Sequence, residues 1–154
     1  MKGNEKVIAE LNINLIDEIT AINQYMMHSE MCKDWGYEKL HEYIEKRALK
    51  EMEHAEELME RILFLEGKPI VTKLNKIMVG KDVPAMMAND HAAELDAIKS
   101  YNKSIAVCVA EGDNGSRALL EANLKDEEEH IDWIEAQQDQ IDQMGIQLYL
   151  STKI

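Results

Sequence analysis

The chain has 154 residues, of which 45% are hydrophobic and 31% charged, and its formal net charge is -13. This length suits one domain over residues 1–154, and the composition argues against a disordered, collagen-like or membrane-spanning chain. The acidic excess disfavours nucleic acid as a partner, because phosphates attract Lys and Arg. An acidic surface can attract cations or serve solubility alone, so the charge leaves both interpretations open.

Residues 1–5 contain neither the apolar core nor the small-residue cleavage site of a secretion signal. We therefore expect a cytoplasmic protein. The two cysteines, Cys32 and Cys108, fit a reducing compartment, and we expect them to behave as small buried hydrophobic residues.

Apolar residues at alternating spacings of three and four predict four long helices. The first two should cover about 5–32 and 39–66, followed by a connection of about sixteen residues, 67–82. Such a connection is long enough to run back along a helix of about 28 residues. Further helices are expected over about 83–111 and 116–144, with a short fifth helix over 146–150. Two hairpins joined by one long crossover predict an all-α four-helix bundle.

Each long helix carries one glutamate in the middle of its apolar seam. Six polar residues on these seams form two sets related by an offset of 76 residues: Glu18, Glu51 and His54, then Glu94, Glu127 and His130. The offset indicates a helical hairpin used twice, and a pseudo-twofold axis would let the six side chains converge. Glu38 and His41 have the same three-residue spacing but lack this symmetry, so we interpret them as a coincidence.

Four buried carboxylates without partners would each cost several kcal/mol, so their place on the seams predicts bound cations. Without cations, their mutual repulsion should raise their pKa values. Two divalent ions would balance the four negative charges with both imidazoles neutral. One glutamate from each of two helices and Glu-x-x-His from each of the other two is the di-iron carboxylate pattern. Oxygen and imidazole ligands favour iron or manganese, and the chain has no cysteine cluster for structural zinc.

Four further side chains near the seams allow two readings each. Tyr25 and Tyr101 lie seven residues beyond a seam glutamate, where they could hydrogen-bond the ligand carboxylates or simply pack in the core. Trp133 could donate electrons near the metals, although a packing role is favoured. His91 is interpreted as a polar core residue or as part of an access route.

Three stretches of the chain resemble signature sequences of the bacterioferritins, the haem-containing bacterial branch of the ferritins: 21–25 (AINQY), 61–67 (RILFLEG) and 126–133 (DEEEHIDW). The resemblance covers essentially the whole chain. It implies a ferritin-like bundle with one long crossover and a short C-terminal fifth helix. It further implies iron storage and detoxification by a homo-oligomeric shell of 24 subunits, built from twofold dimers. Each subunit would oxidise Fe(II) with O2 or H2O2, and the shell would store the ferric mineral.

The same resemblance implies a role for each of the six seam residues. Glu51 and Glu127 would bridge the two irons. Glu18 and Glu94 would be terminal carboxylates, and His54 and His130 would each bind one iron. The cofactors would be two iron ions per subunit and a haem. Tyr25 would support the ligands from outside the coordination sphere.

Met52 matches the methionine that binds haem at the dimer axis of the family, which implies one haem per two subunits. The remaining pocket residues would be Ile19, Ile22, Asn23, Met26 and Leu49. The alternative is that Met52 only fills an interface between subunits. The resemblance also implies a small electron-transfer partner, such as a ferredoxin.

One departure from the family concerns the inner surface of the shell. Some members have a His and an Asp there for an extra iron, where this chain has Lys46 and Lys50, which argues against such a site. Two other functions stay open: a di-iron or di-manganese peroxidase or oxygenase on the same bundle, and a purely structural helical oligomer. Rubrerythrin-like peroxidases add a Cys-x-x-Cys iron site, which is absent here, and oxygenases usually have longer chains.

Overall fold

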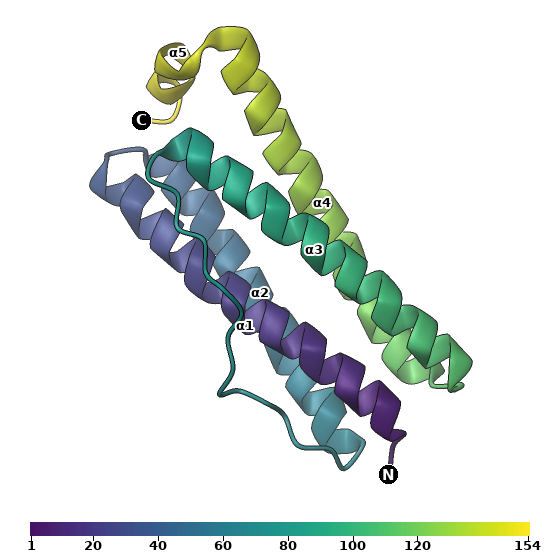
Figure 1. The fold of residues 1–154 in the computed structure, drawn as a ribbon. Coiled ribbons are helices and arrows are strands. Elements are labelled where there is room, and N and C mark those ends of the chain that lie inside the picture. Colours follow the sequence, from purple (N-terminus) through teal and green to yellow (C-terminus); the bar gives the residue numbers. More distant parts are fainter.

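The computed structural model describes all 154 residues and contains helices as its only regular elements. In chain order these are α1 (Glu5–Asp34), α2 (Glu38–Phe64), α3 (Val83–Ala110), α4 (Asn114–Met144) and α5 (Ile146–Ser151). Figure 1 shows α1 beside α2 and α3 beside α4, with the two pairs packed into one bundle. The predicted all-α fold, with one crossover and a short fifth helix, is therefore confirmed.

The helix boundaries follow from local chemistry. Side-chain oxygens of Asn4, Asp82 and Asp113 accept hydrogen bonds from backbone N–H groups two or three residues further on, which caps α1, α3 and α4. Gly36 and Gly112 end the first helix of each hairpin with φ values of +80° and +72°. Glycine adopts this left-handed conformation without steric cost, so the chain can reverse there in a short turn.

The crossover, residues 65–82, runs along α1 (Figure 1), and polar side chains of α1 hold it in place. Four α1 residues accept hydrogen bonds of 2.7–3.0 Å from crossover N–H groups: Asn12, Thr20, Gln24 and His28. These residues are spaced by multiples of four and therefore share one face of the helix. The long connection is thus ordered because α1 satisfies its backbone.

The core consists of two apolar clusters, one toward each end of the bundle. One contains Leu11, Leu58 and Cys108, and the other contains Cys32 and Ile44; all are at most 4% exposed. Burying each large apolar side chain stabilises the fold by about 1.5–3 kcal/mol. Both cysteines are buried free thiols, as expected. The seam glutamates lie between the two clusters, so apolar packing on both sides positions the polar site.

Helix α5 lies across the end of the bundle where α1 turns into α2 (Figure 1). Lys39 of α2 bonds this segment through its backbone N–H to the Lys153 carbonyl and through Nζ to the Thr152 carbonyl. Although four of the helices are long, none has the apolar length that a membrane crossing needs.

Candidate metal centre

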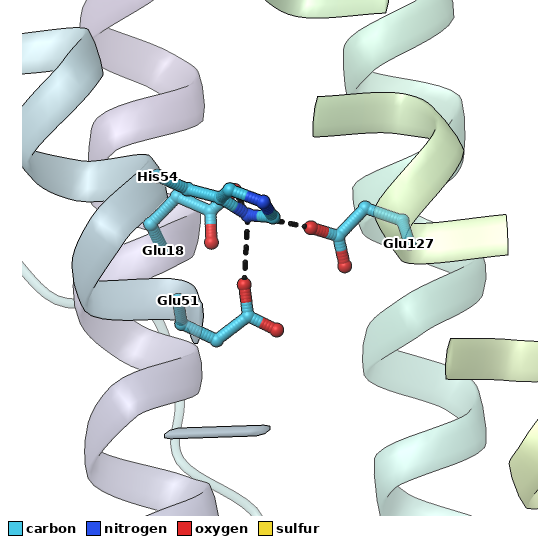
Figure 2. Close-up of side chains that lie close together, drawn as sticks. All are labelled: Glu18, Glu51, His54 and Glu127. Carbon is cyan, nitrogen blue, oxygen red and sulfur yellow. Dashed lines mark hydrogen bonds and ion pairs between the residues drawn. The ribbon is translucent and has the colours of Figure 1, made fainter. Parts of the chain in front are cut away.

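The six seam residues meet in the middle of the bundle. Their ligand atoms form two groups, each with all atoms within 4.8 Å of one another: Glu18, Glu51, His54 and Glu127, and Glu51, Glu94 and His130. All six residues are at most 4% exposed. Figure 2 shows the first group, with side chains from three helices pointing at one another. Glu51 belongs to both groups, where a bridging ligand would have to lie; Glu127 belongs to the first alone, so its bridging role stays a prediction.

The first group is built around His54. Its Nδ1 lies 3.1 Å from Glu51 Oε2, three residues earlier on α2, and 3.1 Å from Glu127 Oε1 on α4. Glu18 Oε1 of α1 lies 3.5 Å from the same nitrogen. Residues three apart share a helix face, which is why α2 presents a carboxylate and an imidazole to one point.

The second group is built differently. His130 Nδ1 lies 2.6 Å from Glu94 Oε1, a residue of α3 rather than of its own helix. The His130 ring also meets the Tyr25 ring edge-on, with 5.3 Å between the ring centroids. The two histidines thus present the same nitrogen to the centre from opposite hairpins.

The donor set of this site fits divalent metal ions. Glu51 Oε1, Glu94 Oε2 and Glu127 Oε1 are buried and accept no hydrogen bond of good geometry. Two of them only make ion-pair contacts, to Arg47 at 2.7 Å and to His54 at 3.1 Å, respectively. Buried carboxylate oxygens without hydrogen bonds are costly unless a cation compensates them, and carboxylate with imidazole suits iron or manganese.

Burial and neighbouring charges give the carboxyl groups different pKa values. Burial, followed by the charges of neighbouring glutamates, raises the pKa values of Glu18 and Glu94 well above 4.5. Burial also acts to raise the pKa of Glu51, but His54 and Arg47 outweigh it and lower this pKa to about 2. The expectation that repulsion raises all four pKa values is therefore wrong for Glu51.

The two histidines also differ in basicity. Burial acts to lower the pKa of His54, but hydrogen bonds to three carboxylates outweigh burial and raise this pKa. Burial and the charge of Arg47 lower the pKa of His130 to about 3. One imidazole is thus held as a cation among carboxylates, while the other stays neutral.

The two seam tyrosines hydrogen-bond the seam glutamates, which is one of the two roles predicted for them. The Tyr25 hydroxyl donates to Glu94, and the Tyr101 hydroxyl donates to Glu18. Each tyrosine therefore serves a glutamate of the other hairpin, a pairing that the sequence pattern does not specify. Both rings are at most 1% exposed, so these bonds fix the carboxylates in place.

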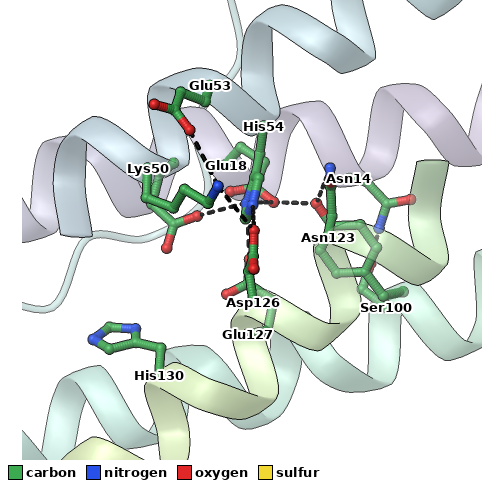
Figure 3. Close-up of polar contacts among 12 residues, drawn as sticks. Asn14, Glu18, Lys50, Glu53, His54, Ser100, Asn123, Asp126, Glu127 and His130 are labelled. Atoms are coloured by element: carbon green, nitrogen blue, oxygen red, sulfur yellow. Dashed lines mark hydrogen bonds and ion pairs between the residues drawn. The ribbon is translucent and has the colours of Figure 1, made fainter. Parts of the chain in front are cut away.

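Asp126 is a contact that sequence reasoning missed. Its Oδ2 lies 3.0 Å from His54 Nε2 and 3.1 Å from Lys50 Nζ, which in turn lies 3.1 Å from Glu53 (Figure 3). Asp126 orients His54 from behind, because it holds the nitrogen that points away from the centre. A signal was present: adding 76 to Lys50 gives Asp126, an opposite charge at the equivalent position.

Arg47 is the second residue that was missed. It is 8% exposed, and its Nη2 lies 2.7 Å from Glu51 Oε1 and 2.8 Å from Glu127 Oε2. Burial acts to lower its pKa, but the two carboxylates outweigh burial and raise it. Its position four residues before Glu51, on the same helix face, could have revealed this contact.

A cleft of about 220 Å³ connects the centre with the surface between α1, α3 and the crossover. Glu18, Glu94 and Glu127 form part of its lining, and Asp17 and Asp96 line it as well. Carboxylates thus extend from the centre toward the surface, which favours the access of cations.

Three other residues of the sequence analysis lie outside the two ligand groups. His91 is partly buried and its Nε2 lies 3.0 Å from Glu135 of α4. Trp133 stacks on Tyr43, with 3.6 Å between ring centroids, which fits its packing role. His41 is buried against Ser29, with 2.9 Å between Nδ1 and Oγ.

The residues expected around a haem lie on the α1–α2 flank. Met52, Leu49 and Met26 are 41%, 53% and 52% exposed. Asn23 is also exposed, whereas Ile19 and Ile22 are partly buried against the core. The flank therefore combines an apolar surface with a methionine thioether.

A comparison with known families supports the fold and the site together. The family model of the ferritin-like domain matches residues 8–144. The chain therefore belongs to the ferritin family.

Curated relatives narrow this class. A bacterioferritin of Streptomyces coelicolor is 43% identical over 100% of this chain and 92% of its own length. A bacterial ferritin of Synechocystis is 42% identical over 100% of this chain and 99% of its own length. A bacterioferritin of Mycobacterium bovis is 38% identical over 97% of this chain and 94% of its own length. The resemblance to bacterioferritins is thus confirmed over the full chain.

Proposed function

We propose that this protein stores iron and that its centre is a ferroxidase site, which oxidises Fe(II) to Fe(III). The observation that carries the proposal is the pair of buried ligand groups that share Glu51. Two divalent ions in these groups would lie close enough to give up electrons to one oxidant molecule. Membership of the ferritin family supports storage of the product.

Fe(II) is the substrate, and the balance of the reaction is simple. Two Fe(II) ions each lose one electron, and these electrons with two protons reduce O2 to H2O2 or H2O2 to two waters. The cleft lined by Asp17 and Asp96 would admit the ions. Tyr25 and Tyr101 hold the terminal carboxylates, and Asp126 aims His54 Nδ1 at the centre.

The ferric product would collect inside a shell of 24 copies built from twofold dimers. Full-length similarity to bacterioferritins supports this assembly, because assembly surfaces extend over the whole subunit. A small electron-transfer protein, such as a ferredoxin, would return electrons for iron release. We place the protein in the cytoplasm.

A haem shared by two subunits completes the proposal. The exposed thioether of Met52, beside the exposed apolar side chains of Leu49 and Met26, suits a macrocycle lying on a dimer axis. The thioether of Met52 from each of two subunits would hold the haem, giving one haem per two subunits. A bound haem would supply a path for electrons through the subunit layer.

The storage proposal is tested by sizing the purified protein, adding Fe(II) without oxygen and then adding oxidant while recording the absorption spectrum. We expect a large oligomer that retains many ferric ions per chain. Glu38→Ala, which changes a Glu-x-x-His sequence outside the centre, is the control and should retain as much iron as the wild type. A small oligomer that retains no iron would contradict the storage function.

The haem proposal is tested separately with Met52→Leu, which keeps volume and apolarity. We expect haem to be lost while the oligomer and Fe(II) oxidation persist. Met59→Leu, on the same helix, is the control and should keep its haem. Full haem with an unchanged spectrum in Met52→Leu would exclude Met52 as the ligand.

A further inference from the structure

Arg47 places a permanent positive charge inside the proposed metal centre. Its Nη2 lies 2.7 Å from Glu51 Oε1 and 2.8 Å from Glu127 Oε2, so one nitrogen joins the two glutamates expected to bridge the metals. The side chain is 8% exposed, and arginine stays charged at any physiological pH. The contact is therefore a buried, charge-assisted link between α2 and α4.

A metal ion and this guanidinium would compete for the same oxygens. A bond between a metal ion and a carboxylate oxygen is about 2.1 Å long, which is shorter than either ion pair of Arg47. An ion bound by Glu51 Oε1 and Glu127 would therefore lie within a few ångströms of the guanidinium, and two cations that close repel each other strongly in a buried site.

Charge balance indicates which binding step is affected. Once the six ligands are in the metal-binding form, with four ionised carboxylates and two neutral imidazoles, these groups together with Arg47 and one divalent ion leave one negative charge in the centre. A second divalent ion turns this into one positive charge, which a buried site with few counter-ions does not tolerate. The first ion can thus bind beside Arg47, whereas the second requires its departure.

A place for the displaced side chain is already present. Arg47 Nη1 already donates to the backbone carbonyl of Asp126 at 3.3 Å. A change of side-chain rotamer could move the guanidinium toward Asp126 and away from the centre. The equivalent position in the other hairpin is the neutral Asn123, so the pseudo-symmetric pattern does not require a cation here.

We propose that Arg47 is an internal counter-cation: it holds Glu51 and Glu127 together before metal binds and must leave them when the second ion binds. Arg47 thereby weakens binding of the second ion and stabilises the metal-free protein. The inference rests on the proposed two-metal function.

The test is a calorimetric titration of the metal-stripped, assembled protein with Co(II), which air does not oxidise under these conditions. For Arg47→Gln we expect the second ion to bind about 10- to 100-fold more tightly, the range over which residues around metal ligands change affinity. The melting temperature of the metal-stripped variant should fall. Arg117→Gln removes an exposed arginine that forms an ion pair with Glu121, four residues further along α4. This control should change neither the affinity for the second ion nor the melting temperature.

Lys50→Gln tests whether the effect on second-ion affinity requires direct contact with Glu51 and Glu127 or only a nearby positive charge. Lys50 lies 3.1 Å from Asp126 but makes no ion pair with Glu51 or Glu127. We expect a smaller gain in affinity than for Arg47→Gln; an equal gain, or an unchanged second-ion affinity in Arg47→Gln, would overturn the inference. A wild-type protein that binds no pair of ions would instead contradict the proposed function.

Arg47→Lys provides a variant that keeps the charge if the glutamine variant does not fold. A lysine presents one ammonium group instead of a planar fork, so it should hold the two glutamates less firmly and raise second-ion affinity by less than glutamine. A second ion bound as tightly as in Arg47→Gln would count against the proposal, because lysine keeps the positive charge. So would a crystal structure with two Co(II) ions in which Arg47 still contacts both glutamates.

Discussion

The two hairpins of the bundle carry the same ligand types at equivalent positions, yet they give these ligands different surroundings. In the first hairpin, His54 lies among carboxylates that raise its pKa, and Asp126 bonds its outer nitrogen. In the second, His130 lies beside the Tyr25 ring, and its pKa is lowered to about 3. Helical register therefore fixes where the ligands are, but not how they are charged.

The difference has its origin at two pairs of positions. Arg47 and Lys50 of α2 correspond to Asn123 and Asp126 of α4. A sequence repeat that keeps its ligands has thus placed two cations on α2 and a neutral amide and an acid at the equivalent positions of α4. We therefore expect the two proposed metal positions to differ in affinity although their ligands match in type.

Removing either glutamate expected to bridge the metals should have the largest effect. Glu51→Ala removes a ligand of both groups, so we expect rapid Fe(II) oxidation to fall by at least about 1,000-fold, equivalent to about 4 kcal/mol. Glu127→Ala should also abolish rapid oxidation, with the assembled oligomer retained in both variants. Stopped-flow spectroscopy measures the rates, and a wild-type rate in either variant would refute the ligand assignment.

The histidines should differ in what they contribute before metal binds. His54→Ala leaves buried carboxylates without their cationic partner, so the metal-stripped protein should lose about 3 kcal/mol of stability. His130→Ala removes a neutral ring, and we expect a smaller loss, about 1–2 kcal/mol. Thermal unfolding of the two metal-stripped variants measures this difference, and equal losses would remove the proposed charge asymmetry.

Two conservative glutamate variants should change stability in opposite directions. The pKa of Glu94 is raised above its ordinary 4.5, so its stabilising protonated form is fully present below pH 4.5 and is lost as pH rises through the folded value. Near neutral pH, metal-stripped Glu94→Gln should therefore be more stable than wild type by about 1 kcal/mol, with the gain disappearing in acid.

Glu51→Gln should have the opposite effect on stability to Glu94→Gln. The pKa of Glu51 is lowered to about 2, so its charged form contributes stability above pH 4.5 that is lost as pH falls through the folded value. Metal-stripped Glu51→Gln should be less stable than wild type near neutral pH. A destabilised Glu94→Gln or a stabilised Glu51→Gln would show that the two carboxyl groups have been assigned the wrong charge states.

The tyrosines should have the smallest effect. Tyr101→Phe and Tyr25→Phe each remove one hydrogen bond to a terminal carboxylate and leave the ring packing unchanged. We expect Co(II) affinity to fall by about fivefold in each, or about 1 kcal/mol. In each variant, titration should show weaker binding mainly of the ion held by the glutamate that accepted the hydrogen bond of the tyrosine. A loss of Co(II) affinity larger than the one measured for His54→Ala would contradict this order.

The fold could be predicted from the sequence because periodic apolar residues specify each helix and the length of the crossover specifies the connection. The convergence of the six seam residues could be predicted for the same reason, since one face of each helix must point inward. The seam pattern alone does not identify the contacts of Arg47 and Asp126. Arg47 lies one turn before Glu51 and Asp126 lies one residue before Glu127, and the groups that they contact depend on side-chain conformations across two helices.

The hydrogen bonds of the tyrosines also could not be predicted from the seam pattern. Register places Tyr25 on the seam of α1, but the glutamate that it bonds belongs to α3, and this choice depends on how far apart the helices pack. The expectation that all four carboxyl groups have raised pKa values is wrong for Glu51, because it did not include the lowering effects of His54 and Arg47 on this pKa. Seam patterns thus predict ligands, while the charges around them require the assembled structure.

The central claim is that each subunit oxidises Fe(II) at a centre that binds two ions. The most direct test loads the metal-stripped protein with increasing Fe(II) in the absence of oxygen, mixes it rapidly with oxidant and records the amplitude of the fast phase. We predict that this amplitude saturates at two Fe(II) per chain and is absent in Glu51→Ala. A fast phase without saturation at two ions, or one that is unchanged in Glu51→Ala, would contradict the claim.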